Sequence, residues 1–522
     1  MKTKALQRGI GLLQTGAFAE AAAIFEAEVL KQPKNLDVQF LLGSSYASMG
    51  RIDEAIRHLE KAEEIDPASP RVAYNLGTVY LRLKRYQSAE AYFQLALQSD
   101  PSFLLAHQNL ASLYLSTGRY ERANEHFKKM SSHASSRVVG LAGQATSLER
   151  LGRYREAYDM IWPLFLKGDR SLEVLNLLAR ICSHEEINSK AETMVLKALE
   201  ASPPANWVHL SASTKASYFF SQGHLYEKKG EYVSAFSAFA EAKSSLPQTF
   251  DEEAHQTFCD GYRQRLNKIS KARPRKNSSV PNLVFVVGMP RSGSTLVEQI
   301  LVSHPSQPDS VGESSHFAQT LAEVIGWENV NKWESAWVEL SGEEKEAVRH
   351  GYLTRVMGSE SKRAMVVDKT LNNAYFLPLI FSLFPTARAL YCQRDPVAIC
   401  LSCFKIDFAG MHAYTNNLEV LGRTCRRFNG LMEKMKKAYP HRIYPVDYEV
   451  LVRDFQPQVE ALLTFCDLPF AQECLAFHRS QRVVRTASYH QVSKPLYDHS
   501  VSLHERYGTL LDPLRQALEG TD

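Results

Sequence analysis

A regular spacing of prolines constrains the first half of the chain more than any other feature. Pro33, Pro67 and Pro101 are spaced 34 residues apart. Proline can end a helix but cannot continue one, so each of these positions marks the end of a helical unit. A fixed period of this length is typical of a repeated helix–turn–helix unit. Residues 1–250 are therefore predicted to form an array of helical hairpins.

Small residues recur at matched positions within these units. The first helix carries Gly43, Gly77, Ala111, Ala145 and Ala179, and the second carries Ala55, Ala89, Ala123, Ala157 and Ala191. Small side chains at a helix contact let the two helix axes approach closely. The register continues to Pro203 and, after ten extra residues around Pro204 to Thr214, resumes at Gly223, Ala235, Ala242 and Pro247. This pattern predicts seven units, the first and last less regular, as terminal caps are.

The period and pattern resemble the tetratricopeptide repeat. Arrays of this kind bind a partner peptide on their concave face, or brace a neighbouring domain or a dimer. Repeat architecture defines a surface and not a ligand, so both uses stay open. A linker helix and a basic, proline-containing linker are expected over residues 251–280, and a second domain over residues 281–522.

The second domain opens with a strand, a glycine loop and a helix. Leu283 to Val287 is an apolar run typical of a buried strand, and Thr295 to Leu301 carries apolar residues at helical spacing. Backbone N–H groups of such a loop and the start of the helix converge on one anion. Gly288 and Gly293 have the spacing of a nucleotide-triphosphate loop, but Ser294 stands where that loop has lysine. The missing lysine disfavours a kinase or ATPase.

This segment, PRSGSTL from Pro290 to Leu296, resembles the 5′-phosphosulfate loop of sulfotransferases that use 3′-phosphoadenosine 5′-phosphosulfate (PAPS). A second region agrees: the strand-like Arg388 to Cys392 is followed by Arg394 and, eight residues later, Ser402. In the family an arginine and a serine at this spacing hold the 3′-phosphate. The resemblance implies a P-loop-like α/β domain with a parallel sheet. It also implies a set of donor-binding residues: Arg291, Ser292, Gly293, Ser294, Thr295, Arg394 and Ser402.

The resemblance also implies catalytic residues. A glutamate after the glycine of Gly312-Glu313 is the general base in the family, and sulfuryl transfer to a hydroxyl needs such a base. Protein-tyrosine sulfotransferases, to which the domain is distantly similar, have Gly-Glu-Glu here and use the second glutamate, whereas this chain has Ser314. His316 is the alternative base. Lys369 occupies the position of a lysine that, with Arg291, balances charge on the leaving oxygen.

Two further segments extend the resemblance towards the C-terminus. Tyr448 lies in a segment similar to the family's Val-x-Tyr-Glu, whose tyrosine is near the nucleotide, and a core role for this aromatic ring is the alternative. Residues 485–495 resemble a segment that closes over PAPS, with Lys494 reaching the phosphate end of the donor.

Composition excludes several classes of protein. The 522 residues are 44% hydrophobic and 23% charged with a formal net charge of +4, which does not favour nucleic-acid binding. No apolar run reaches the roughly 18 residues of a membrane span, and the N-terminus has no leader pattern, so a cytoplasmic protein is expected. The eight cysteines follow no disulfide pattern, and Cys400 and Cys403 are interpreted as residues of a buried helix.

Three functions stay open at this stage. The first is a PAPS-dependent sulfotransferase that releases PAP, the 3′,5′-bisphosphate, and needs no metal because arginine, lysine and amides supply the positive charge. Its acceptor hydroxyl could belong to protein tyrosine, carbohydrate or a small molecule, and the repeat array could recruit it or form a homodimer. The second is a catalytically silent nucleotide-binding repeat scaffold, and the third is a P-loop kinase.

Overall fold

The computed structural model describes residues 4–184, 187, 189–201, 207–265, 281–333, 337, 339–357, 364–479 and 502–520. The chain divides into two compact units, Met1–Val195 and Leu196–Asp522. The basic linker and Lys494 lie outside the described residues. The domain boundaries near residues 250 and 280 stay predictions.

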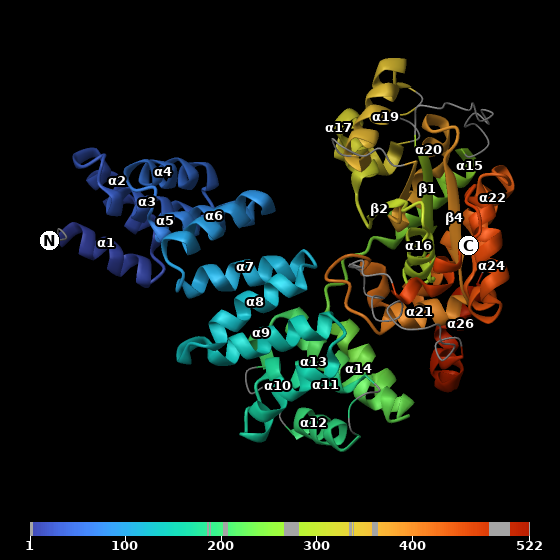
Figure 1. The fold of residues 1–522 in the computed structure, drawn as a ribbon, viewed down its shortest axis with the longest axis horizontal. Helices are drawn as coiled ribbons and strands as arrows, with labels where there is room; N and C mark the ends of the chain where they lie inside the picture. The colour runs from blue at the N-terminus through green and yellow to red at the C-terminus, as the bar shows by residue number, and fades with distance from the viewer. Residues whose placement is uncertain are drawn as a thin grey trace. The chain divides into compact units, whose positions relative to one another are not determined.

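Helices α1 to α14 follow one another in consecutive pairs within the described residues (Figure 1). They are α1 (Lys4–Gln14), α2 (Phe18–Lys31), α3 (Leu36–Ser48), α4 (Ile52–Ile65), α5 (Pro70–Arg82), α6 (Tyr86–Ser99), α7 (Leu104–Ser116), α8 (Tyr120–Ser131), α9 (Arg137–Arg150), α10 (Tyr154–Leu166), α11 (Leu172–Cys182), α12 (Ser189–Ala201), α13 (Ala212–Lys228) and α14 (Tyr232–Ser245). Pro33, Pro67 and Pro101 lie between pairs, as the spacing predicts.

The small residues sit where the two helices of a pair touch. A Cβ atom added at Gly43 would come within 2.8 Å of Leu59 Cγ, and one at Gly77 within 2.7 Å of Phe93 Cδ1. Ala55 and Ala89 on the second helices are completely buried. The repeated small residues therefore allow the close helix approach that the sequence predicts.

A parallel sheet of five strands forms the centre of the second unit. The strands are β1 (Asn282–Gly288), β2 (Asp309–Gly312), β3 (Met365–Asp368), β4 (Arg388–Gln393) and β5 (Ile443–Asp447), in the order β2-β3-β1-β4-β5 (Figure 1). All four strand pairings are parallel. Parallel neighbours need crossover connections, which here contain helices. The predicted α/β domain with a parallel sheet is confirmed.

Helices and short 3₁₀ segments surround this sheet. The α-helices are α15 (Glu252–Arg265), α16 (Ser294–Val302), α17 (His316–Ile325), α19 (Gly342–Met357), α20 (Leu377–Leu383), α21 (Pro396–Phe404), α22 (Leu418–Ala438), α23 (Tyr448–Arg453), α24 (Phe455–Phe465) and α26 (Asp512–Glu519). The 3₁₀ segments of this domain are η3 (Trp327–Lys332), η4 (Leu371–Phe376), η5 (Ala413–Asn416), η6 (Gln472–Arg479) and η7 (Leu503–Leu511), whereas η1 (Ala134–Ser136) and η2 (Trp207–His209) lie between repeat helices. No described helix is long and apolar enough to cross a membrane.

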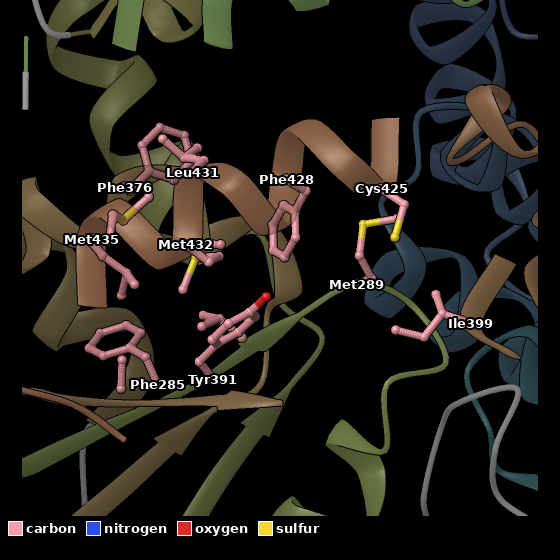
Figure 2. Packing of buried hydrophobic residues seen from close by; sticks show 14 of the residues in the cluster. Phe285, Met289, Phe376, Tyr391, Ile399, Cys425, Phe428, Leu431, Met432 and Met435 are labelled. Atoms are coloured by element: carbon pink, nitrogen blue, oxygen red, sulfur yellow. The ribbon is translucent and has the colours of Figure 1, made fainter. Parts of the chain in front are cut away.

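Strand β1 is buried on both faces of the sheet. Successive strand residues point to opposite faces of the sheet. Phe285 therefore belongs to one apolar core, and its neighbours Val284 and Val286 belong to the other. Figure 2 shows the first core, where Phe428 and Met432 of α22 pack over Phe285 and over Tyr391 of β4. The second core contains apolar residues of α16 and α24.

The first core also includes the last repeat pair. Phe220 of α13, together with Ala235, Phe239 and Ala242 of α14, belongs to the same buried cluster as Phe285. Lys405, which follows α21, forms an ion pair with Glu227 of α13 at 2.6 Å. Helices α13 and α14 continue the repeat pattern in sequence, yet they pack as part of the α/β unit.

Candidate active site

The site residues that the sequence predicts gather at one edge of the sheet. Arg291 follows β1, Glu313 follows β2, Lys369 follows β3, Arg394 follows β4 and Tyr448 follows β5. The carboxyl ends of parallel strands meet at the same edge, and open α/β sheets bind their ligands there. Sequence segments more than 150 residues apart thus contribute to one candidate site.

The glycine loop has a backbone suited to close approach by a ligand. Gly293 has a φ of 92° and precedes the first residue of α16, Ser294. A Cβ atom at Gly293 would lie 2.5 Å from Tyr448 Cδ2, so only glycine fits between the loop and this ring. Ser292 is 1% exposed, and its hydroxyl has no hydrogen-bond partner among the described residues. A buried hydroxyl without a protein hydrogen-bond partner at the start of a helix can donate a hydrogen bond to an anionic ligand.

The two predicted phosphate motifs meet in the structure. Arg291 Nε donates to Ser402 Oγ at 2.9 Å, and Arg394 Nη1 donates to the Arg291 carbonyl oxygen at 3.3 Å. The Arg394 guanidinium lies 4.8 Å from the centre of the Tyr448 ring, a cation–π distance. Two arginines, a serine and an aromatic ring thus form one positively charged group.

Lys369 is the most buried charge of the site. Its side chain is 0% exposed, and Nζ lies 2.5 Å from Glu313 Oε1 and 3.7 Å from Glu298 Oε2. Glu313 is 46% exposed, whereas Glu298 is 5% exposed and also accepts a hydrogen bond from Ser310 Oγ. Lys369 therefore links one accessible carboxylate with one enclosed carboxylate.

Sequence reasoning missed Glu298. A signal was available, because Glu298 and Gln299 interrupt an otherwise apolar stretch of α16. A charged residue enclosed in an apolar helix face needs a partner of opposite charge. The partner, Lys369, is 71 positions further along the chain.

His316, the alternative base, begins α17. Burial lowers the pKa of His316, and Arg355 lowers it further, while the Asp368 carboxylate opposes both effects. Its Nδ1 is buried without a hydrogen-bond partner among the described residues. Burial also raises the pKa of Asp368, which accepts hydrogen bonds from Tyr352 Oη at 2.8 Å and Thr370 N at 2.9 Å.

Cys400 and Cys403 are buried residues of α21, as the sequence predicts. Burial raises the pKa of Cys403 to about 12, so its thiol stays protonated near neutral pH. In the part of the chain that the structure describes, no group of three potential metal-ligating residues lies together.

Comparison with known families identifies the class of the N-terminal repeats and of the C-terminal domain. Residues 281–472 match the sulfotransferase family, and residues 6–70, 40–102 and 80–145 match tetratricopeptide repeat families. The chain therefore combines tetratricopeptide repeats with a sulfotransferase-family domain, which confirms the resemblance inferred from its motifs.

Individual relatives cover parts of the chain. An uncharacterized protein of Aquifex aeolicus (strain VF5) is 29% identical over 325 residues, which are 59% of this chain and 42% of that protein. The chain thus spans less than half of that relative's length. A putative protein-tyrosine sulfotransferase of Caenorhabditis briggsae is 26% identical over 207 residues, which are 38% of this chain and 71% of that protein.

Two solved structures are similar to parts of the chain. The sulfotransferase domain of the Synechococcus PCC 7002 olefin synthase is 20% identical, covers 48% of this chain and 98% of that one, and has a TM-score of 0.32. A crystal structure of MamA is 24% identical, covers 29% of this chain and 89% of that one, and has a TM-score of 0.27.

Proposed function

We propose that the protein is a PAPS-dependent sulfotransferase that moves a sulfuryl group to a hydroxyl acceptor. The observation that carries this proposal is the hydrogen bond between Arg291 and Ser402, with Arg394 beside it. The two phosphate motifs of the family resemblance thereby contribute to one site. The family match over residues 281–472 supports the sulfotransfer chemistry.

The residues around the glycine loop support PAPS as the donor. The Ser292 hydroxyl lacks a protein partner among the described residues, and Gly293 leaves room for close approach beside the start of α16. In the proposal, Arg291 to Thr295 hold the phosphosulfate end. Arg394 and Ser402 hold the 3′-phosphate through charge-assisted hydrogen bonds, and Tyr448 lies beside Arg394.

The residues proposed to act in the transfer of the sulfuryl group are Glu313, Lys369 and Arg291. When bound, PAPS supplies an activated sulfuryl group with PAP as its leaving group. Glu313 takes the acceptor proton as the acceptor oxygen forms its bond to sulfur and the bond from sulfur to PAP breaks. Lys369 and Arg291 balance the charge that develops on the leaving oxygen. Glu313 is accessible enough to meet an acceptor, while Lys369 is shielded from water.

Protein tyrosine is the acceptor we favour, because one relative carries the name putative protein-tyrosine sulfotransferase. The repeat array would recruit the acceptor protein, since tetratricopeptide repeats suit protein binding. A cytoplasmic location remains a prediction from the sequence.

The test of the donor pocket is calorimetric titration of the whole chain with PAP, with ATP as the comparison. We expect micromolar binding of PAP and no comparable binding of ATP, because Ser294 replaces the lysine that reaches outer phosphates. A folded chain that binds no PAP would instead favour the scaffold function. A preference for ATP would favour a kinase.

The substitution Arg394→Ala should weaken PAP binding by about 2–3 kcal/mol, because it removes charged hydrogen bonds to the 3′-phosphate. This corresponds to a rise in Kd of roughly 30- to 150-fold. Arg388→Ala is a matched control, since Arg388 begins the same strand and pairs with Asp467 at the opposite edge of the sheet. Equal PAP affinities for the two variants would rule out this role of Arg394.

A further inference from the structure

Helix α21 joins the two phosphate motifs of the proposed donor site. Ser402 lies in its last turn and accepts a hydrogen bond from Arg291 Nε at 2.9 Å. The next residue, Cys403, donates from Sγ to the Pro290 carbonyl oxygen at 3.4 Å. The position of α21 against the glycine loop therefore decides where the Ser402 hydroxyl lies.

The C-terminal end of α21 contacts the last repeat pair, α13 and α14. Lys405 follows the helix, and its Nζ donates to both carboxylate oxygens of Glu227 on α13, at 2.6 Å and 2.7 Å. The Lys405 and Glu227 side chains are only 12% and 16% exposed, so water screens this ion pair little. Lys405 is three positions after Ser402, so about one helical turn separates the ion pair from the Ser402 hydroxyl.

Aromatic side chains surround this ion pair. Tyr507 Oη donates a hydrogen bond to Glu227 Oε1, and the Tyr507 ring meets the Phe236 ring of α14 edge-on, with ring centres 6.4 Å apart. The centre of the Phe236 ring lies 5.8 Å from that of Phe404, the last residue of α21. Both partners of the ion pair are therefore held by their surroundings.

A second charged residue of the repeat pair holds the chain just beyond α21. Lys243 of α14 is 1% exposed, and its Nζ donates to the Ile406 carbonyl oxygen at 2.7 Å and to Thr415 Oγ1 at 3.0 Å. Between these acceptors, Ala409 and His412 have φ angles of 51° and 57°, which residues other than glycine rarely adopt. Such a backbone persists only where its surroundings hold it, and Lys243 supplies part of that support.

The charged character of these contacts suggests a purpose beyond packing. Burying a lysine or a glutamate is costly even when it is paired, and apolar residues of similar volume often stabilise a protein interior as well or better. Hydrogen bonds depend on distance and direction, so they fix the end of a helix more narrowly than apolar packing does. A hydroxyl that must meet a phosphate oxygen at hydrogen-bond distance needs such a fixed position.

We propose that Glu227 and Lys243 are positioning residues for the 3′-phosphate of the donor, acting through the end of α21 on Ser402. The inference rests on the proposed function, in which Ser402 holds the 3′-phosphate. It gives the last repeat pair a bracing role in the donor site, which is one of the two uses of the array that the sequence leaves open.

The test is calorimetric titration of the whole chain with PAP and with adenosine 5′-monophosphate (AMP). AMP has the same nucleoside and 5′-phosphate but no 3′-phosphate, so the ratio of the two Kd values reports the 3′-phosphate contacts. The wild type should bind PAP roughly tenfold or more tightly than AMP. Glu227→Gln and Lys243→Met should each raise the Kd of PAP roughly three- to tenfold and leave the Kd of AMP within about twofold of its wild-type value.

Two further variants serve as controls. Glu231→Gln is matched to Glu227→Gln, because Glu231 pairs with Lys229 at 2.7 Å in the same repeat pair but has a side chain that is 43% exposed. It should leave both Kd values unchanged. Lys405→Arg keeps a positive charge that can bind both oxygens of Glu227, so it should retain most of the preference for PAP.

A charge-free pair keeps the test decisive if Glu227→Gln or Lys243→Met does not fold. Glu227→Gln/Lys405→Met removes both charges and leaves neither of them buried without its partner. This double variant should fold and should show the same loss of preference for PAP.

The outcomes separate this inference from the proposed function. A wild-type ratio of Kd values in the folded variants overturns the inference while the donor pocket stands, and a change in only one single variant removes the other residue from the role. Equal weakening of PAP and AMP also overturns it, because the contacts then support the whole site and not Ser402. A wild type that binds PAP no more tightly than AMP overturns the 3′-phosphate role of Ser402 in the proposed function, and the inference with it.

Discussion

Replacing Lys369 by methionine is expected to lower kcat by roughly 10²–10³-fold and also to weaken PAP binding, because the leaving oxygen that Lys369 would balance is fully charged in PAP. Lys369 is a preorganised positive charge in a shielded place, and removal of one such group commonly has this effect on turnover. The Lys369 side chain is 0% exposed, so water does not screen its positive charge. The measurement is steady-state turnover with labelled PAPS beside calorimetric titration with PAP.

The same substitution should also destabilise the fold. Without Lys369, the enclosed Glu298 carboxylate loses its countercharge, 3.7 Å away, and breaking a buried ion pair in this way costs about 3–5 kcal/mol. The double variant Glu298→Gln/Lys369→Met removes the Glu298 charge as well and should regain most of this stability in urea unfolding. Its turnover should stay low. Recovery of turnover together with stability would show that Lys369 acts through the fold and not on the reaction.

The sequence predicts the parts of this fold that depend on local pattern. A 34-residue period suffices to predict a helical repeat array, because proline and small residues act within each unit. The apolar run before Gly288 suffices to predict the central strand β1, because a strand buried on both faces has no polar positions.

Packing over long separations could not be predicted from those patterns. Helix α14 has the repeat signature, yet its Lys243 contacts residues 163 and 172 positions away and its apolar face enters the core under the sheet. A lysine in a repeat helix is ordinarily a solvated residue. Only the three-dimensional arrangement identifies it as a buried contact.

The candidate site also has features that the sequence predicts and features that it does not. The family motifs lead to Arg291, Arg394 and Ser402, because their spacing along the chain is itself the signal. The hydrogen bond that joins Arg291 to Ser402, and the enclosure of Glu298 beside Lys369, arise from strand order and have no sequence signature. Sequence motifs thus predict the chemical groups of this site better than their pairing.

The substitution Glu313→Gln should keep PAP affinity and lower turnover by roughly 100-fold or more, because the amide cannot accept the acceptor proton. Lys369 keeps Glu298 as its countercharge in this variant, so the fold should be retained. Glu323→Gln is the control, since Glu323 is an exposed glutamate on α17 that pairs with Arg355. It should leave turnover unchanged.

His316→Ala decides between the two candidate bases. If Glu313 is the base, His316→Ala should retain most of the turnover, because the carboxylate that takes the acceptor proton is unchanged in this variant. If His316→Ala alone abolishes turnover and Glu313→Gln does not, His316 takes the proton. In that case Glu313 serves to pair with Lys369, the 2.5 Å contact that the structure shows.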